Sequence, residues 1–325
     1  MVISVSNLSK NYSAYKKSPG ISGSLKSLVS RKYEVVKAVE DISFEIKEGE
    51  FVGFIGPNGA GKTTTLKCLS GLLYPSGGSV RVLGYKPFDR KTPFLKQISL
   101  VLGQKNQLWW DLPAMETFLL NKEIYGVSKE DFNETVEHLS ELLDVKDFVN
   151  IPVRNLSLGQ RMKMELIAAL IHRPKILFLD EPTIGLDVVM QKKIRSFLKE
   201  YNEKYKATII LTSHYMEDVQ ELCKRVIVIN FGRVIYDGDL DKLIKKHSPF
   251  KEITVILDKE IDEEKIKKFG DLHSYNFPEW ILRVDKEKTN KVASDILANF
   301  PVEDISIEDP EVDTVIHDIF SKSKK

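Results

Sequence analysis

Short apolar runs, each ending at a turn and followed by apolar residues at helical spacing, recur along the N-terminal three quarters of the chain. Four of these runs are near-continuous in Val, Ile, Leu and Phe, at Phe51–Ile55, Ile176–Leu179, Ala207–Thr212 and Val226–Ile229. Such runs suit strands that are buried on both faces of a mainly parallel sheet. The alternation of strands with helices therefore predicts an α/β domain in which these four strands are central.

The pattern becomes helical and more polar between about residues 105 and 173. Two segments, Lys129–Leu143 and Leu158–Ile171, carry apolar residues at the spacing of one helix face. Because this stretch separates two strand-rich halves, it predicts a helical subdomain inserted into the α/β core.

The composition shifts again after Gly238, to a segment rich in Lys and Glu. Alternating patterns such as KEITVILD and WILRVD flank helical ones such as TNKVASDILANF. They predict a small α+β domain with the order β-α-β-β-α-β over residues 239–325, after a first domain of residues 1–238. No residue of this second domain suggests a chemistry, so a regulatory, a dimerising and a partner-binding role all stay open.

Bulk composition excludes several classes of protein. Of 325 residues, 42% are apolar and 29% charged, and the net charge is +1, so the chain is globular and has no global attraction to nucleic acid or anionic lipid. Cys68 and Cys223 lie in helix-like segments without metal-ligand spacing, which predicts buried, reduced thiols. The N-terminus does not resemble a signal peptide, and no apolar run is long enough to span a bilayer. We therefore expect a cytoplasmic protein, unless another chain holds it at a membrane.

The strongest local motif fits GxxxxGK[ST], the phosphate-binding loop. It follows the strand Phe51–Ile55 and precedes a helix expected at Thr64–Leu73, so that backbone N–H groups and the helix N-terminus converge on phosphates. Lys62 would contact the β- and γ-phosphates, and the Thr63 hydroxyl would bind Mg²⁺. The predicted ligands are ATP and Mg²⁺, with contacts from Gly56, Pro57, Asn58, Gly59, Ala60, Gly61, Lys62, Thr63 and Thr64.

A second element is an apolar strand, Ile176–Leu179, that ends in two carboxylates. Asp180 is placed to reach Mg²⁺ directly or through water, and Glu181 is placed to orient and deprotonate the attacking water. An apolar strand ending in Asp-Glu is weak evidence alone, because a solvated strand end has the same pattern. Its combination with a phosphate loop favours the catalytic interpretation.

Between these two elements lies Leu156-Ser157-Leu158-Gly159-Gln160, which resembles the LSGGQ signature of the ABC ATPase family. Three further residues match family positions in the expected order. Gln104 matches the Q-loop glutamine, Asp187 the D-loop aspartate, and His214 the switch histidine. The resemblance covers residues 1 to about 238 and implies a P-loop ABC ATPase core.

The resemblance implies a head-to-tail dimer, in which the phosphate loop of one subunit and Ser157, Gly159 and Gln160 of the other hold each ATP. It also implies that Gln104 links Mg²⁺ and water to a permease contact, and that His214 holds the γ-phosphate and the water. Lys62, Gln104, Glu181 and His214 are accordingly the expected catalytic residues, and Thr63, Gln104 and Asp180 the metal ligands. The partners are transmembrane permease subunits and a second ATPase, either a copy of this chain or a paralogue.

Leu158 departs from the signature, where the family most often has Gly. Leucine restricts the backbone and adds bulk near the expected interface. The variant resembles that of bacterial exporter ATPases of the daunorubicin and viologen exporter subgroup. That likeness is the sole indication that transport is export.

Adenine recognition is open between two tyrosines. Tyr33 stands at about the usual distance before the phosphate loop, and Tyr12 matches the aromatic of the usual N-terminal sequence; we favour Tyr33. The insertion Ser13–Lys32 separates them and carries five basic residues, no acidic ones and a short apolar set. A membrane-facing segment and a solvated surface loop are equally compatible with it.

The adjacent residues Trp109 and Trp110 follow the Q-loop, where the family binds a coupling helix of the permease. We expect one to be a core residue and the other a docking anchor. The function predicted from the whole pattern is ATP hydrolysis that powers transport, by a peripheral protein at the inner face of the cell membrane.

The main rival is a soluble ABC ATPase acting in nucleic-acid or cofactor-assembly processes. The chain lacks a long coiled-coil insertion and has one ATPase core, which disfavours that class. A third class, a module that senses ATP without hydrolysing it, is disfavoured by the presence of Glu181 and His214. The transported substrate is set by the permease and is not readable from this chain.

Overall fold

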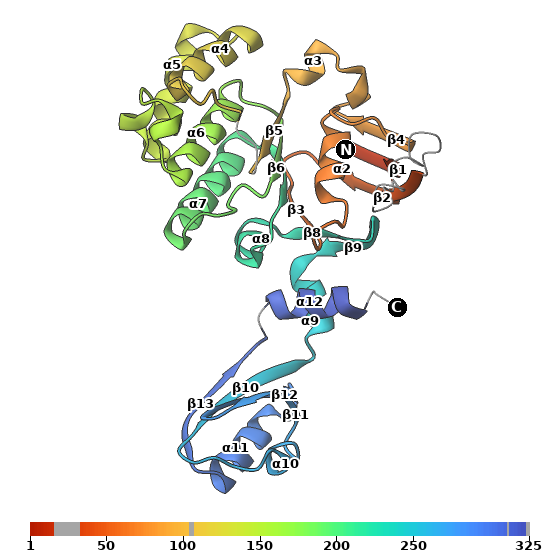
Figure 1. The fold of residues 1–325 in the computed structure, drawn as a ribbon, viewed down its shortest axis with the longest axis vertical. Coiled ribbons are helices and arrows are strands. Elements are labelled where there is room, and N and C mark those ends of the chain that lie inside the picture. The colour runs from red at the N-terminus through yellow and green to blue at the C-terminus, as the bar shows by residue number, and fades with distance from the viewer. Residues whose placement is uncertain (16–32, 104–106, 311, 323–325) are drawn as a thin grey trace, which may run out of the picture. The chain divides into compact units, whose positions relative to one another are not determined.

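The computed structural model describes residues 1–15, 33–103, 107–310 and 312–322, and its ribbon is drawn in Figure 1. The chain divides into two compact units, Met1–Asp239 and Leu240–Lys325. The basic part of the insertion, residues 16–32, lies outside the described residues, as does Gln104.

A six-stranded sheet forms the centre of the first unit. Its strand order is β5-β6-β7-β3-β8-β9, parallel except for the antiparallel pair β8–β9. The four predicted central strands occupy the four inner positions, as their unbroken apolar sequences require. The strands are β3 (Phe51–Ile55), β5 (Ile98–Leu102), β6 (Ile176–Asp180), β7 (Thr208–Thr212), β8 (Arg225–Asn230) and β9 (Arg233–Asp239).

A smaller antiparallel sheet, with the order β2-β1-β4, packs against the same core. It consists of β1 (Ile3–Tyr15), β2 (Tyr33–Ile46) and β4 (Gly77–Val82). Its inward-facing residues, such as Ile3 and Phe44, join Phe54 of β3 and Leu66 of the following helix in one apolar cluster. This cluster holds the small sheet to the parallel one and fixes the phosphate loop between them.

Helices cover the parallel sheet, and α4, α5 and α6 form a separate group beyond the β5 edge (Figure 1). These helices lie within the stretch of about residues 105–173 for which a helical subdomain is expected. The helices of the first unit are α2 (Lys62–Leu69), α3 (Thr92–Leu95), α4 (Ala114–Tyr125), α5 (Lys129–Leu142), α6 (Leu158–Leu170), α7 (Val188–Tyr205) and α8 (Met216–Leu222). Short 3-10 turns lie at Pro87–Asp89, Lys146–Phe148 and Val153–Asn155.

Two local expectations were wrong. The helix after the phosphate loop is α2, which begins at Lys62 and ends at Leu69 rather than spanning Thr64–Leu73. It stops because Gly71 adopts a φ of 78°, at a point where a Cβ would lie 2.3 Å from the carbonyl oxygen of Pro87. Cys223 is not helical but extended, directly after α8. Both cysteines are free and buried.

In the second unit two helices that the sequence did not predict, α9 and α12, flank six elements in the expected order β-α-β-β-α-β, and the four strands form an antiparallel sheet ordered β11-β12-β10-β13. One sheet face packs on α11 around Trp280, which is fully buried. The elements are α9 (Leu240–His247), β10 (Phe250–Leu257), α10 (Glu263–Ile266), β11 (Asp271–Asn276), β12 (Glu279–Asp285), α11 (Thr289–Asn299), β13 (Val302–Glu308) and α12 (Val312–Lys322).

Candidate functional site

The phosphate loop runs from the end of β3 into the first turn of α2. At Gly61, φ is 107° and an added Cβ would lie 2.4 Å from the carbonyl oxygen of Ala38, so only glycine fits. Gly56 is equally confined, against the carbonyl of Ile229 in β8. The loop therefore has one backbone path, which presents its N–H groups at the helix start. Within it Ala60 is buried, Asn58 and Gly59 are exposed, and Pro57, Thr63 and Thr64 are half-buried.

Lys62 is held at the base of this loop. Its Nζ donates to the carbonyl oxygen of Gly56 at 2.6 Å and to that of Pro57 at 3.2 Å, and the residue is 5% exposed. Burial lowers the pKa of Lys62, and the charges of Glu181 and Asp180 oppose that shift. The nearby carboxylates thus favour the charged ammonium, the form that binds phosphate.

The two predicted carboxylates stand at the C-terminal end of β6. Asp180 is buried, and its Oδ1 accepts a hydrogen bond from the hydroxyl of Thr212 at 2.7 Å. Thr212 ends the neighbouring strand β7 and is paired with Asp180 in the sheet. No local sequence pattern marks Thr212, because its role follows from pairing between strands that are distant in the chain.

Glu181 has an unusual backbone conformation for the residue before a proline. Its φ is 56°, and its N–H donates to both the carbonyl and the hydroxyl oxygen of Thr212, at 3.0 and 3.1 Å. A left-handed conformation at a non-glycine residue costs on the order of 1–3 kcal/mol and persists where the surroundings impose it. Here it turns the Glu181 side chain toward His214, whose Nε2 lies 2.6 Å from Oε1 of Glu181.

Asp180, Glu181 and His214 converge on one cavity of about 340 Å³. Its lining joins the phosphate loop and α2 to the ends of β5, β6 and β7, and comprises Asn58, Thr63, Lys67, Leu102, Asp180, Glu181, Ile184 and His214. Lys67 and Asn58 add polar groups, and of these the motif did not assign Lys67 a role. The cavity can hold a phosphate chain beside a carboxylate and an imidazole.

The same cavity contains a donor set that suits Mg²⁺. Thr63 offers a hydroxyl and Asp180 a carboxylate, the oxygen ligands that Mg²⁺ takes beside phosphates and water. Among the described residues, no cluster of three or more His, Cys, Asp or Glu side chains could hold a metal ion. The third predicted ligand, Gln104, lies outside the described residues.

The signature residues surround the start of α6. Ser157 is the N-cap, and its hydroxyl accepts from the N–H of Gln160 at 3.2 Å while the Gln160 side chain accepts from the N–H of Ser157 at 2.9 Å. This reciprocal capping box fixes the helix end. None of the signature residues belongs to the described lining of the cavity around Glu181. The described part of this cavity is therefore formed without the signature of the same chain.

Asp187 caps the adjacent helix α7, accepting from the N–H of Met190 at 2.9 Å. The two helix starts touch, because an added Cβ on Gly159 would lie 3.1 Å from the Met190 side chain. Leu158, the departure from the family pattern, is 41% exposed, and its Cδ2 would lie 3.2 Å from a Cβ added at Gly185. The signature and the D-loop thus form one continuous surface.

The other predicted binding residues are placed less decisively. In the β1–β2 hairpin Tyr12 pairs with Val36 and Tyr15 with Tyr33, so Tyr12 and Tyr33 lie on opposite faces of the strands. Only one of the two can face a given ligand.

The expectation of one core tryptophan was wrong: Trp109 is 52% and Trp110 49% exposed. Leu108, 5% exposed, occupies the buried position instead.

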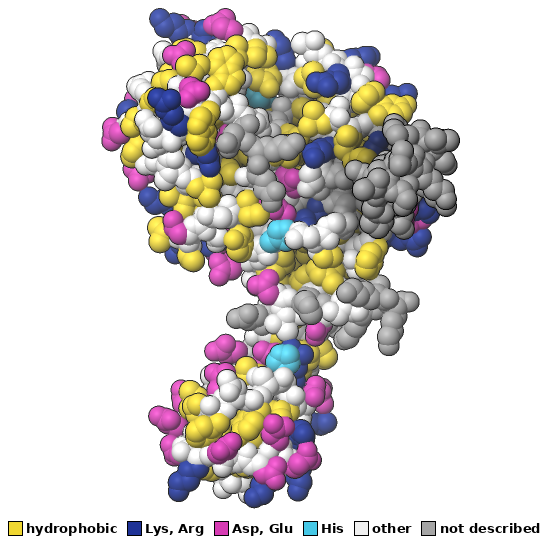
Figure 2. All heavy atoms as spheres, in the orientation of Figure 1, with side chains coloured by type: hydrophobic (Ala, Val, Ile, Leu, Met, Phe, Trp, Pro, Cys, Tyr) yellow, Lys and Arg dark blue, Asp and Glu magenta, His cyan; other side chains and the backbone are white. Residues whose placement is uncertain are grey.

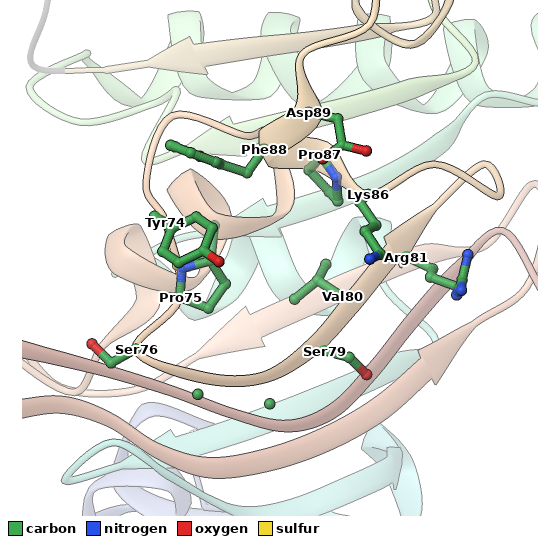
Figure 3. Close-up of a pocket in the computed structure, with 13 residues that line it drawn as sticks. Tyr74, Pro75, Ser76, Ser79, Val80, Arg81, Lys86, Pro87, Phe88 and Asp89 are labelled. Carbon is green, nitrogen blue, oxygen red and sulfur yellow. The ribbon is translucent and has the colours of Figure 1, made fainter.

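A second cavity, of about 410 Å³, lies beside strand β4 (Figure 3). The rings of Tyr74 and Phe88 flank it, 4.6 Å apart, and Lys86 and Val80 face it from the other side. No residue of the phosphate loop and neither carboxylate contributes to it. The larger volume is therefore not the nucleotide site.

Figure 2 shows charges of both signs interspersed over the visible surface. Across the described residues, no helix combines the length and the apolar character needed to cross a bilayer.

Comparisons with known proteins agree with the geometry. Residues 39–184 match the family model described as ABC transporter, and residues 249–308 match the C-terminal domain of EvrA-like ABC transporters. The chain is 39% identical over 212 residues to the ABC transporter ATP-binding protein NatA of Bacillus subtilis, covering 65% of this chain and 86% of the relative. It is 35% identical to the Nod factor export ATP-binding protein I of Burkholderia orbicola, covering 67% and 71%.

A solved structure supports the same conclusion. The dimeric ATP-binding cassette MJ0796, bound to ADP and Pi in a post-hydrolysis state, superimposes with a TM-score of 0.61 at 26% identity, covering 73% of this chain and 98% of that one. The parallel sheet, the cavity at the phosphate loop and the match to the ABC transporter family model all lie in the first unit. The chain is therefore an ATPase and belongs to the family of ATP-binding subunits of ABC transporters.

Proposed function

We propose that Glu181 and His214 carry out the hydrolytic step of this ATPase. The supporting observation is that both reach the cavity formed by the phosphate loop and lie 2.6 Å apart. Glu181 orients a water and takes its proton, while His214 holds that water and the γ-phosphate in line. Lys62 and the loop N–H groups stabilise the charge of the phosphates.

Thr63 and Asp180 are the proposed ligands of Mg²⁺, together with Gln104 from the segment outside the described residues. The bound ion would neutralise phosphate charge and orient the γ-phosphate. Thr212 fixes the Asp180 carboxylate through the 2.7 Å hydrogen bond. This division leaves Glu181 free to act on water.

The signature is proposed to act on the opposite subunit's ATP. Ser157 and the helix start that it caps form an anion-binding end, since a helix N-terminus offers free N–H groups and a partial positive charge. Gly159 and Gln160 shape that end, and Asp187 anchors the helix that touches it. Because this surface is separate from the chain's own phosphate loop, two subunits in head-to-tail arrangement complete two sites.

The transport role follows from the relatives. We propose that the chain drives separate transmembrane permease subunits, on the cytoplasmic side of the cell membrane, in the direction of export. The name of the Nod factor export relative and the Leu158 variant of the signature support export. Trp109 and Trp110, half-exposed after the Q-loop, are the proposed permease contact. A soluble ABC ATPase without a permease is not favoured by these relatives.

For the adenine we propose Tyr33 as the stacking residue, with Tyr12 on the opposite face of the hairpin as the alternative.

For the domains we propose a nucleotide-binding domain of residues 1–238, with its helical subdomain near residues 105–173, and an accessory domain of residues 239–325. The match of residues 249–308 to an EvrA-like C-terminal domain supports the second of these.

The test of the catalytic assignment is Glu181→Gln in the full chain. It keeps the shape of the side chain and removes the proton acceptor, so kcat for ATP should fall by about 10²-fold or more while ATP still binds. Glu134→Gln, which removes an exposed carboxylate from α5, is the matched control and should keep parental turnover. Near-parental kcat in Glu181→Gln would refute the assignment.

A further inference from the structure

Asp218 is a completely buried carboxylate in α8, at 0% exposure, outside the cavity described above. Its Oδ2 accepts two hydroxyl hydrogen bonds, from Thr183 at 2.5 Å and from Ser213 at 2.7 Å. Its Oδ1 accepts from Nη1 of Arg195 in α7 at 3.0 Å. A single side chain thus joins the loop after β6, helix α7 and the residue that directly follows β7.

Two of those segments carry the residues assigned to hydrolysis. Thr183 stands two residues after Glu181, and Ser213 stands directly before His214. The Ser213 hydroxyl also accepts from the N–H of Tyr215 at 3.0 Å, which closes a tight turn around His214. The segments of Glu181 and His214 are therefore both attached to one carboxylate oxygen.

Asp218 is buried together with an oppositely charged partner. Burying an unpaired carboxylate is strongly unfavourable. Here Arg195, 3% exposed, supplies the opposite charge and is itself paired with Glu221 at 2.9 Å and Glu217 at 3.3 Å. Removing one partner of such a buried pair is strongly destabilising. The hydrogen bonds that the Asp218 carboxylate accepts are also stronger than those between neutral groups.

Only an acceptor at this oxygen can hold both hydroxyls at once. The register of β6 and β7 ends at Asp180 and Thr212, and the N–H of Glu181 makes the last backbone hydrogen bond between the two segments, to the carbonyl oxygen of Thr212. Beyond that point Oδ2 of Asp218 joins the two segments, by accepting from Thr183 and Ser213. The left-handed φ of Glu181 persists because its surroundings impose it, and the bond of Thr183 to Asp218 is part of those surroundings.

We propose that Asp218 is a positioning residue for ATP hydrolysis, which holds the segments of Glu181 and His214 at a fixed separation through Thr183 and Ser213. The inference rests on the catalytic roles proposed above for those two residues. Asp218 does not touch the nucleotide. Its effect is on the alignment of the reacting groups, where displacement by about 1 Å can cost on the order of 10²-fold in rate.

The first variant is Asp218→Asn in the full chain. The amide oxygen is expected to stay with Arg195, which leaves the NH₂ group, unable to accept, opposite the two hydroxyls. We expect kcat to fall by about 10-fold or more and the KM for ATP to change less than about 3-fold, because the phosphate loop is untouched. The matched control is Glu221→Gln, which removes a different partner of Arg195 and should retain parental kcat.

Two smaller variants guard against a folding defect in Asp218→Asn. Thr183→Val and Ser213→Ala each remove one of the hydroxyls at Oδ2. Each should lower kcat with little change in KM, and the double variant should lose less than the product of the two single effects, because both act through one oxygen. Thermal unfolding of every variant establishes that the assays compare folded proteins.

A merely structural role gives a different result. It lowers the midpoint of thermal unfolding and leaves kcat parental at temperatures where the variants are folded, and that outcome overturns the proposal. Glu181→Gln, assayed in parallel, separates the two hypotheses. If Glu181→Gln turns over normally, the catalytic assignment fails; if Glu181→Gln is impaired while Asp218→Asn, Thr183→Val and Ser213→Ala keep parental kcat, only the positioning role fails.

Discussion

At the scale of single residues, burial decides which titratable groups contribute to stability. His172, at the end of the α6 segment, stacks on Tyr125 with ring centroids 3.7 Å apart, and its Nε2 lies 3.1 Å from the carbonyl oxygen of Ile98. Its Nδ1 is buried without a hydrogen-bond partner. Burial lowers the pKa of His172 from 6.5 to about 4.

The sign of this shift gives a pH-dependent prediction. Since the folded protein favours the neutral ring, the contribution of His172 to stability is complete above pH 6.5 and is lost as the pH falls toward 4. The loss approaches roughly 3 kcal/mol in the free energy of unfolding. His172→Phe keeps the stack on Tyr125, so we expect a smaller loss of stability between pH 7 and pH 4.5 than in the parent.

Chemical denaturation at the two pH values measures this difference. Other groups titrate in the same range, so the comparison is between the pH-dependent changes of the two proteins. An equal change in both proteins would show that His172 is not the responsible group.

At the scale of elements, two helix starts carry the residues that we propose face the partner subunit. The capping box of α6 satisfies backbone donors of the helix end and simultaneously fixes the signature. Asp187 does the same for α7, and the contact of Gly159 with Met190 leaves no space between the two helix starts. A change at either cap should therefore affect both folding and ATP-dependent association.

Ser157→Ala separates the two effects when compared with a second N-cap. Ser128 caps α5 through the same kind of hydrogen bond, to the N–H of Asp131 at 3.0 Å. Each substitution should cost about 1 kcal/mol in the free energy of unfolding. Only Ser157→Ala should also weaken ATP-driven dimerisation, because Ser128 lies outside the signature.

Denaturant titration and sedimentation measure the two quantities. Equal dimerisation by Ser157→Ala and Ser128→Ala would contradict a role for the signature hydroxyl at the opposite site.

At the scale of the whole molecule, the surface next to the signature is apolar and exposed. Val188 is 70% and Val189 67% exposed at the start of α7, directly before Met190, whose side chain lies against Gly159 of the signature. Exposed aliphatic residues around a polar anion site suit an interface that closes over a ligand. This arrangement agrees with a dimer that forms around ATP.

The mass of the Glu181→Gln chain in solution tests that assembly. With ATP and Mg²⁺, slowed hydrolysis should shift the protein from monomer to dimer, and with ADP it should remain monomeric. The shift follows from differential binding of ATP to the associated state. Persistent monomer with saturating ATP would argue against self-complementary sites and for a different chain as the second ATPase.

The sequence by itself determined the parts of this protein that depend on neighbouring residues. The inner strands are visible because burial on both faces requires unbroken apolar runs, and the phosphate loop is visible because its glycines, lysine and threonine act within one turn. Signature and N-caps are likewise local. The order of elements in the second unit follows from alternating periodicity.

Only the tertiary structure decided what depends on contacts between distant segments. The pairing of Thr212 with Asp180, the approach of His214 to Glu181 and the bonds of Asp218 to Thr183 and Ser213 arise where β6, β7 and α8 meet. The early end of α2 and the exposure of both tryptophans also depend on how distant segments pack. Sequence periodicity reports which face of an element is buried, whereas the packing of whole elements sets which polar groups then face each other.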